Sequence, residues 1–214
     1  MLENGKKKMM KDLRIGDKIW TVENGFPVTT NVLGFLEKSR QYIGEYIRIS
    51  FGNEQKLTIS ASHVMFVVGE DNGVSDVFAK DVKIGDMVYV LQNRMTKVVE
   101  VVDLERVQSS GAYVPLTFTG TLIVDGVLVS SYANIGHWKA HTLFTPLRWF
   151  PTLLLDTEQT QDMEGIRTIP GIAKRIGNSV GLITTTKNVQ EEYRRDVIEN
   201  MGRVVSERET ICMI

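Results

Sequence analysis

A nine-residue motif occurs twice in this chain, and its repetition constrains the fold more than any other feature. The segment "DLRIGDKIW" at residues 12–20 recurs as "DVKIGDMVY" at 81–89, and "GEYIRISF" at 44–51 recurs in pattern as "GAYVPLTF" at 111–118. The two shifts, 69 and 67 positions, nearly agree. A unit of roughly 65–70 residues is too long for one solenoid repeat, so we predict a gene duplication whose copies pack about a pseudo-two-fold axis.

The segments around these motifs have the composition of short β-strands. Val, Ile, Thr, Tyr and Phe dominate runs such as "YIRISF" at 46–51 and "VMFVV" at 64–68, which is typical of strands. Asn24-Gly25 and Asp125-Gly126 separate such runs, and these dipeptides favour type I′ turns. The pattern predicts one mostly β domain over residues 1–136, in which the halves 12–68 and 81–132 are equivalent.

The sequence changes character after residue 136. Apolar residues recur at three- and four-residue steps from Leu143 onward and again over 164–183, with prolines interrupting both stretches. Such spacing predicts short helices. We expect a helical region over 137–183 and a charged, helical tail over 184–214. We expect the apolar face of the region 137–183 either to bind a sterol or a membrane surface or to pack on the β domain.

Composition excludes several classes of protein. Of 214 residues, 43% are hydrophobic and the formal net charge is −1, which gives no general attraction to nucleic acid. The single cysteine, Cys212, excludes an internal disulfide and a metal site built on several thiolates. The longest apolar stretch, 143–155, contains Arg148 and two prolines and is too short to span a bilayer. Residues 1–20 lack the apolar core of a signal peptide.

His63 is the first candidate for chemistry. It lies three residues after Ser60, which ends a strand-like run. Across a bend, a hydroxyl and an imidazole at this spacing can converge on one small group, one binding a carbonyl oxygen and the other transferring a proton. The alternative is a hydrogen-bonded core histidine. We assign His137 and His141 to packing or interfacial roles, because no HExxH or cysteine spacing supports zinc.

Four stretches carry a family resemblance: "MLENGKKKMMKDLRIGDKIW", "LTISASHVMFV", "DVKIGDMVYVL" and "GAYVPLTFTGTLIVDGVLVSSYANI". Together they resemble the C-terminal autoprocessing domain of hedgehog proteins, a Hint fold that is shared with inteins. The resemblance covers residues 1–150, is most specific over 111–148, and continues weakly into 164–183, which resembles the sterol-recognition region of hedgehog proteins. It implies a duplicated, pseudo-two-fold β fold, in agreement with the internal repeat.

The resemblance implies intramolecular cleavage. In the family, a cysteine attacks the preceding peptide carbonyl, forms a thioester by an N-to-S acyl shift, and loses the acyl group to a sterol hydroxyl. The family's Thr-x-x-His motif, whose histidine protonates the leaving nitrogen, falls on Ser60 and His63, with serine replacing threonine. The family's aspartate, the general base for the sterol hydroxyl, falls on Glu37, whose longer side chain shifts the carboxylate.

Two positions depart from the family pattern. The family strand ends Ser-Cys-Tyr with its cysteine facing the nucleophile, whereas this chain has Ser131 at the cysteine's place. The nucleophilic cysteine precedes a "LENG"-like segment, and Met1 falls in that region. Two interpretations stay open: a nucleophile upstream of Met1, or a degenerate Hint domain that acts as a sterol-binding, membrane-binding or structural module. A third, an unrelated β-rich interaction domain, requires the 111–148 resemblance to be accidental.

Partners and location follow from the same resemblance. It implies a sterol, in the family cholesterol, as co-substrate, with no cofactor and no metal. It also implies an upstream signalling fragment attached in cis, contact with a membrane surface, and a place in the secretory pathway or outside the cell. No nucleic-acid partner is expected.

Overall fold

The computed structural model describes residues 1–150. The predicted helical segment over 164–183, the charged tail over 184–214 and Cys212 therefore lie outside the described residues. The described part is mostly β, as predicted, and ends in two short helices. Its elements are, in chain order, the 3-10 helix η1 (Met10–Asp12), β1 (Lys18–Glu23), β2 (Phe26–Phe51), β3 (Lys56–Ser60), β4 (His63–Val68), β5 (Val74–Phe78), the 3-10 helix η2 (Ala79–Asp81), β6 (Met87–Gln92), β7 (Met95–Thr117), β8 (Thr121–Val124), β9 (Val127–Ala133), α1 (His137–Leu143) and α2 (Thr145–Trp149).

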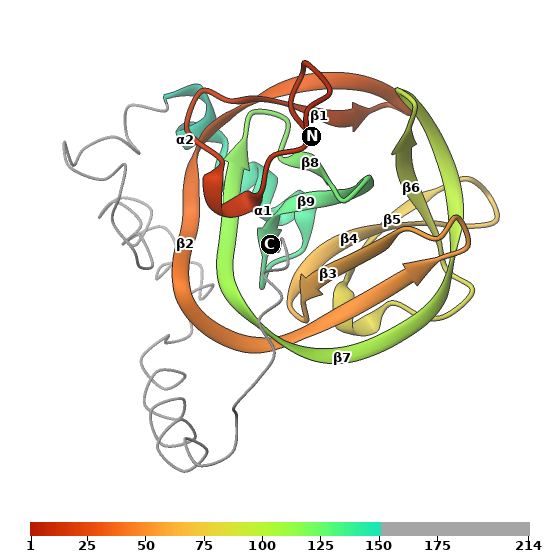
Figure 1. Ribbon diagram of the computed structural model, residues 1–214. Helices are drawn as coiled ribbons and strands as arrows, with labels where there is room; N and C mark the ends of the chain where they lie inside the picture. The colour runs from red at the N-terminus through yellow and green to blue at the C-terminus, as the bar shows by residue number, and fades with distance from the viewer. Residues whose placement is uncertain (151–214) are drawn as a thin grey trace, which may run out of the picture. The chain divides into compact units, whose positions relative to one another are not determined.

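Two long strands, β2 and β7, frame the domain. They pair antiparallel from Val32 opposite Thr117 to Phe51 opposite Val101, with four register shifts along the ladder. Extra residues in a ladder bend the strand and increase its twist. Strands of 26 and 23 residues therefore curve around the shorter strands rather than extending straight (Figure 1).

The two copies of the sequence repeat adopt the same turn. In the first, the Arg14 N–H donates to the Asp17 Oδ2 at 2.8 Å, and in the second the Lys83 N–H donates to the Asp86 Oδ2 at 2.8 Å. Each turn follows a 3-10 helix of three residues. The aspartate of "IGD" is therefore a turn residue that accepts a backbone N–H in both halves.

The glycine of each repeat joins the turn to the long strand of its own half. The Gly16 N–H donates to the Val32 carbonyl and the Gly85 N–H to the Val101 carbonyl, both at 2.8 Å. Their φ angles are +87° and +94°, a left-handed conformation that glycine adopts without steric cost. The shared hydrogen bonds explain why the motif recurs with both glycine and aspartate retained.

The halves share their order of elements but differ in how their last short strands pair. Each half runs from a 3-10 helix through a short strand and a long strand to two short strands. The long strands pair antiparallel with each other, as a two-fold axis between them requires. In the first half β3 pairs with β2, whereas in the second half β8 pairs with β9. The two halves therefore share the turn, the short strand and the long strand, while the superposition of 12–68 on 81–132 stays a prediction.

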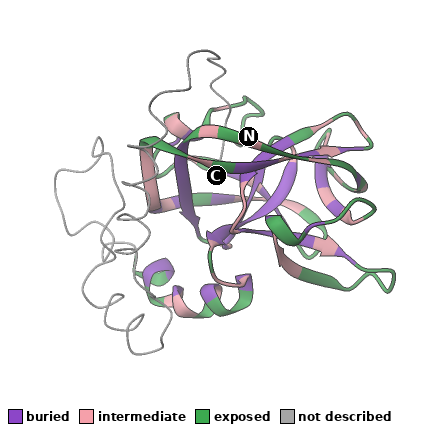
Figure 2. Ribbon diagram, turned by 90° about the horizontal axis from the view of Figure 1, so that it is seen from below, coloured by how far each residue is buried: buried purple, intermediate pink, exposed green. Residues whose placement is uncertain are grey.

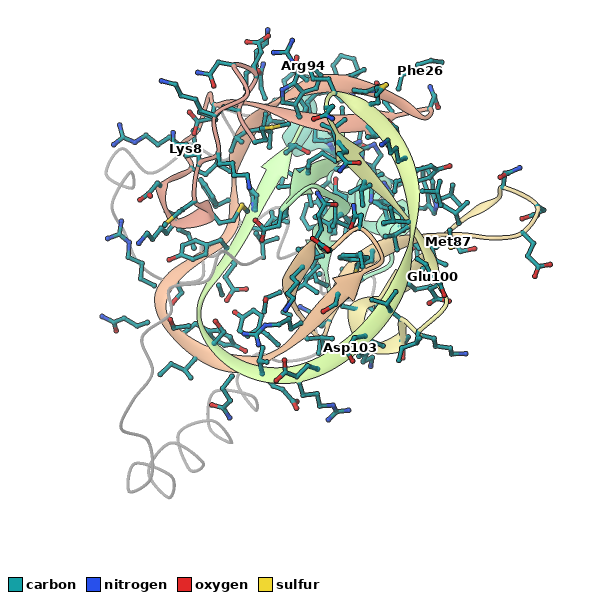
Figure 3. All side chains as sticks on the ribbon, turned by 45° about the vertical axis from the view of Figure 1, so that its right-hand side comes forward. Lys8, Phe26, Met87, Arg94, Glu100 and Asp103 are labelled. Atoms are coloured by element: carbon teal, nitrogen blue, oxygen red, sulfur yellow. The ribbon has the colours of Figure 1, made fainter. Side chains whose placement is uncertain are left out.

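Both halves contribute to one main apolar cluster. It includes fully buried residues of the first half, such as Ile49 and Leu57, and of the second half, such as Val88, Val101 and Val129. Figure 2 shows that burial concentrates on the inner strands. Figure 3 shows Phe26 and Arg94 on the outer edge, away from this core.

Helices α1 and α2 cover part of the β domain with one face. Their buried apolar residues contact two residues of the β domain in a separate cluster made of Leu116, Tyr132, Ala140, Phe144 and Leu147. Trp149 and Phe150 remain exposed, at 67% and 62%, and the helices show one buried and one exposed side in Figure 2. Leu147 therefore packs against the β domain, which is one of the two expectations for this region. Within residues 1–150, no helix has the length and apolar character needed to cross a membrane.

Candidate active site

His63 is the first residue of β4 and is completely buried. Its Nε2 lies 2.7 Å from the carbonyl oxygen of Ser130 on β9. Because a carbonyl only accepts, the Nε2 carries the hydrogen and donates it. In the neutral ring, the lone pair that can accept a proton is then on Nδ1.

A bulge in β9 makes this contact. His63 pairs with Ala133 and Met65 pairs with Val129, so β9 advances four residues while β4 advances two. Ser130 therefore lies in the irregular part of the ladder, where its carbonyl can turn toward an imidazole instead of a strand N–H. Bulges often occur next to active sites because they redirect groups in this way.

The second ring nitrogen of His63 has no partner within residues 1–150. Its Nδ1 is buried and makes no hydrogen bond to any described residue. Burial lowers the pKa of His63 to about 4, and the hydrogen bond to the Ser130 carbonyl opposes this only in part. The imidazole is therefore neutral at pH 7, and no described group donates a hydrogen bond to the buried lone pair of its Nδ1.

Ser60 ends β3 and lies one turn before His63. It is half-buried and pairs with Tyr46 of β2. The turn between the two strands is held at both sides, since the Lys80 N–H donates to the Ala61 carbonyl and the Asn134 N–H to the Ser62 carbonyl. The structure therefore brings Ser60 and His63 to adjacent strand ends, as their sequence spacing indicates.

Ser131 is fully buried in the same bulge as Ser130. Its hydroxyl lies 2.9 Å from the Thr117 hydroxyl, which donates to the Thr121 carbonyl at 3.0 Å. Because Thr117 uses its hydrogen on that carbonyl, Ser131 is the donor to Thr117. Ser131 thus lies beside the His63 contact but has its hydrogen committed to β7.

Glu37 lies in β2 before Tyr46, opposite Val114 of β7 and next to a register shift. No hydrogen bond or ion pair within residues 1–150 joins it to His63. Burial raises the pKa of Glu37, which makes its carboxylate more basic. Burial, then Tyr42, then Glu37 raise the pKa of Tyr46, so the Glu37 carboxylate is near the residue that pairs with Ser60.

Sequence reasoning missed a polar cluster between Tyr132 of β9 and the two helices. It contains the buried guanidinium of Arg148, whose Nη1 donates to the Tyr132 hydroxyl and to His141 Nδ1, both at 2.9 Å. Burial and then the Arg148 charge lower the pKa of His141, which favours the neutral ring. A tyrosine and a histidine separated by eight residues give no helical or strand period that would signal this contact.

No group of three or more His, Cys, Asp or Glu side chains within residues 1–150 is placed to hold a metal ion.

The bent β domain with its internal repeat has the fold of Hint modules and inteins. The family of the Hint module matches residues 1–181, and the chain belongs to that family. The intein PabCDC21-1 has the same fold, with a TM-score of 0.51 and 12% identity over 62% of this chain and 94% of that one.

Within the family, the chain is similar to hedgehog proteins. It is 34% identical over 159 residues to Sonic hedgehog protein of Xenopus laevis, which covers 70% of this chain and 35% of that protein. It is 30% identical over 158 residues to Protein hedgehog of Drosophila erecta, covering 72% of this chain and 34% of that protein. The chain thus spans about a third of the length of these relatives.

Proposed function

We propose that this domain cleaves the peptide bond before a cysteine that lies upstream of Met1, and that a sterol hydroxyl takes over the released acyl group. The observation that carries the proposal is the buried Nδ1 of His63, which is neutral and has no partner among the described residues. A buried polar atom without a partner costs free energy in a structural role. It is suited to a substrate peptide N–H.

In the first step, the cysteine thiol gives its proton to Nδ1 of His63, and the thiolate attacks the carbonyl carbon before it. The carbon–nitrogen bond breaks, and Nδ1 returns the proton to the leaving nitrogen, which leaves a thioester and a free amine. The Ser60 hydroxyl binds the carbonyl oxygen as negative charge develops there. The Ser130 carbonyl keeps the imidazole oriented and stabilises the transient imidazolium.

In the second step, Glu37 removes the proton of the sterol hydroxyl, and the oxygen attacks the thioester carbon while the thiolate leaves. The raised pKa of Glu37 supports this role, because a more basic carboxylate is a better general base near neutral pH. The reaction needs a sterol as co-substrate and no cofactor. The upstream fragment, attached in cis, leaves as a sterol ester in the secretory pathway, at a membrane surface or outside the cell.

A fusion protein tests the proposal. A folded reporter is joined to the chain through a leader that begins Cys-Phe, in the register of hedgehog proteins before Met1. Incubation with dithiothreitol, which intercepts a thioester, is expected to release the reporter, whereas the matched leader with Ala in place of Cys stays intact. A folded Cys fusion that stays uncleaved in dithiothreitol would exclude self-processing by this domain.

Three substitutions in that fusion separate the roles of the side chains. His63→Ala is expected to slow cleavage by about 100- to 10,000-fold, as for loss of one positioned acid or base, and Ser60→Ala to slow it less. Glu37→Gln is expected to leave dithiothreitol cleavage intact and to abolish sterol-dependent cleavage, since only the second step uses it. Equal loss in both assays would assign Glu37 to folding instead.

The alternative function is a degenerate Hint domain that binds a sterol, a membrane or another protein without cleavage. The specific observation in its favour is Ser131, whose hydroxyl is committed to Thr117 where the family has a cysteine. In that case the Cys-leader fusion would fold and remain uncleaved, while liposomes containing sterol would retain the chain.

A further inference from the structure

Ser130 contacts two histidines with two different groups. Its backbone carbonyl accepts the Nε2–H of His63 at 2.7 Å, and its hydroxyl lies 2.9 Å from Nδ1 of His137, the first residue of α1. Ser130 and His137 are both buried, with 0% and 3% of their surface exposed. One residue of the bulge therefore joins the candidate catalytic histidine to the helix that follows the β domain.

The Ser130 hydroxyl has a second partner besides His137. The Tyr132 N–H donates to the Ser130 hydroxyl oxygen at 3.1 Å. This bond leaves the hydroxyl hydrogen available, and Ser130 donates it to Nδ1 of His137 in the tautomer whose ring hydrogen is on Nε2. Burial, followed by the His141 contact, lowers the pKa of His137 to about 4, so this nitrogen is available as an acceptor at neutral pH.

The His137 ring has contacts on several sides, so it can serve as a fixed support. Its centroid lies 4.9 Å from that of Phe66, 5.3 Å from that of His141 and 5.6 Å from that of Tyr132. The backbone N–H of His137 donates to Asp76 Oδ2 of β5 at 2.7 Å, which holds the start of α1 against the β domain. The hydroxyl of Ser130 thus bonds to a ring that is held by three elements.

We propose that His137 is a positioning residue for His63: by holding the Ser130 hydroxyl, it fixes the bulge of β9 and hence the carbonyl that orients the His63 imidazole. Its effect on cleavage rests on the proposed function, whereas its effect on the His63 hydrogen bond does not. The region after the β domain is then coupled to the reaction centre through α1, because displacement of α1 releases Ser130. A ligand that repositions α1 would change the orientation of His63 without touching it.

The test measures the His63 Nε2–H directly in the full chain. Nitrogen-15 labelling of histidine gives the exchange rate of this hydrogen with water, and loss of the signal in His63→Gln assigns it. His137→Phe keeps an aromatic ring but no acceptor, and is expected to accelerate the exchange about five- to tenfold, as for one lost hydrogen bond. His137→Asn, whose Oδ1 can accept from Ser130, is expected to restore slow exchange.

Two further variants keep the result decisive. His141→Phe is the matched control in the same helix, since it keeps an aromatic ring against His137 and removes the Nδ1 contacts with Tyr132 and Arg148. It is expected to lower Tm and leave His63 exchange unchanged. If His137→Phe does not fold, Ser130→Ala removes the same hydrogen bond from its other end and retains the carbonyl. If the exchange of the His63 Nε2–H is unchanged in a folded His137→Phe or Ser130→Ala variant, His137 does not position His63 and only packs against its neighbours.

The cleavage assay adds the catalytic readout. In the Cys-leader fusion, His137→Phe is expected to slow cleavage about ten- to a hundredfold, as for misplacement of a catalytic group, with rescue by His137→Asn. Fast exchange in His137→Phe together with no cleavage in the parent fusion would uphold the positioning of His63 and reject the proposed function. Normal cleavage in His137→Phe despite fast exchange would reject the catalytic consequence.

Discussion

The imidazole of His63 is held by a backbone carbonyl, that of Ser130, at an Nε2 to oxygen distance of 2.7 Å. A neutral acceptor holds the ring in one tautomer without adding a negative charge that would raise its pKa. Burial therefore dominates, and the pKa falls to about 4. In this state Nε2 keeps its hydrogen, and the lone pair of Nδ1 can accept a second proton.

This protonation state predicts how stability depends on pH. Unfolded histidine titrates near pH 6.5, whereas burial lowers the pKa of both His63 and His137 to about 4 in the folded domain. Between these values the unfolded state binds more protons, so the free energy of unfolding is expected to decrease as pH falls from about 6.5 to 4. The slope for each histidine approaches about 1.4 kcal/mol per pH unit. Urea unfolding of the full chain at several pH values measures it.

Substitution isolates the contribution of His63. Burial raises the pKa of Glu37 and Asp125, which acts in the opposite direction over an overlapping pH range. His63→Gln leaves those carboxyls in place, so the difference from the parent reports one histidine. The variant is expected to lose part of the pH dependence between pH 6.5 and 4. The same slope in parent and variant would mean that folding does not lower the pKa of His63.

A second prediction concerns the glycine of the repeated turn. Gly85 has a φ of +94°, and a Cβ built on it meets no atom within 4 Å. Gly85→Ala therefore costs only backbone conformation, and we expect a loss of about 1–2 kcal/mol in the free energy of unfolding. Gly52 is the matched control, because its φ is not left-handed and its Cβ would contact Val102 at an ordinary 3.7 Å. Gly52→Ala is expected to be near neutral, and equal losses in the two variants would contradict the conformational explanation.

The duplication could be predicted because its sequence signal is local. Asp17 and Asp86 accept N–H groups only three residues away, so each copy of "IGD" carries its own turn. The spacing of Ser60 and His63 across one bend is local in the same way. These features depend on short stretches of chain, and their residue types are fixed by backbone geometry that the sequence reveals.

The contacts of His63 could not be predicted in the same way. Its partner is the carbonyl of Ser130, a group that every residue possesses, and the bulge that turns it depends on the pairing of β4 with β9. The contacts of Arg148 depend on how α2 packs against Tyr132. In both cases the information lies in tertiary register, for which a single sequence has no period or spacing.

The hydroxyl chain at Ser131 gives a third prediction. Ser131→Ala removes the donor to Thr117 and is expected to cost about 0.5–1.5 kcal/mol. Thr117→Val removes both hydrogen bonds and leaves the Thr121 carbonyl without this donor, so it is expected to cost about 1–3 kcal/mol. The double variant is expected to cost less than the sum by about 0.5 kcal/mol or more. Urea unfolding of the four proteins measures the coupling, and strict additivity would show that the two hydroxyls do not interact.

The last prediction concerns the buried charge of Arg148. Its Nη1 donates to the Tyr132 hydroxyl at 2.9 Å, while the Tyr132 ring stacks on Phe144 with centroids 5.6 Å apart. Tyr132→Phe keeps the stacking and removes one acceptor from a buried guanidinium, so we expect a loss of about 1–3 kcal/mol in the free energy of unfolding. In an Arg148→Met background the same change is expected to cost little, because the buried charge that needed the hydroxyl is gone.

A surface hydroxyl provides the control for Tyr132→Phe. Thr142 donates to the Trp138 carbonyl at 3.0 Å on the exposed side of α1, where water can replace the lost bond. Thr142→Val is therefore expected to change stability by less than about 0.5 kcal/mol. If Tyr132→Phe costs as much with Met at position 148 as with Arg, the hydroxyl acts through another group, and His141, 3.2 Å from it, becomes the partner that holds α1 in place.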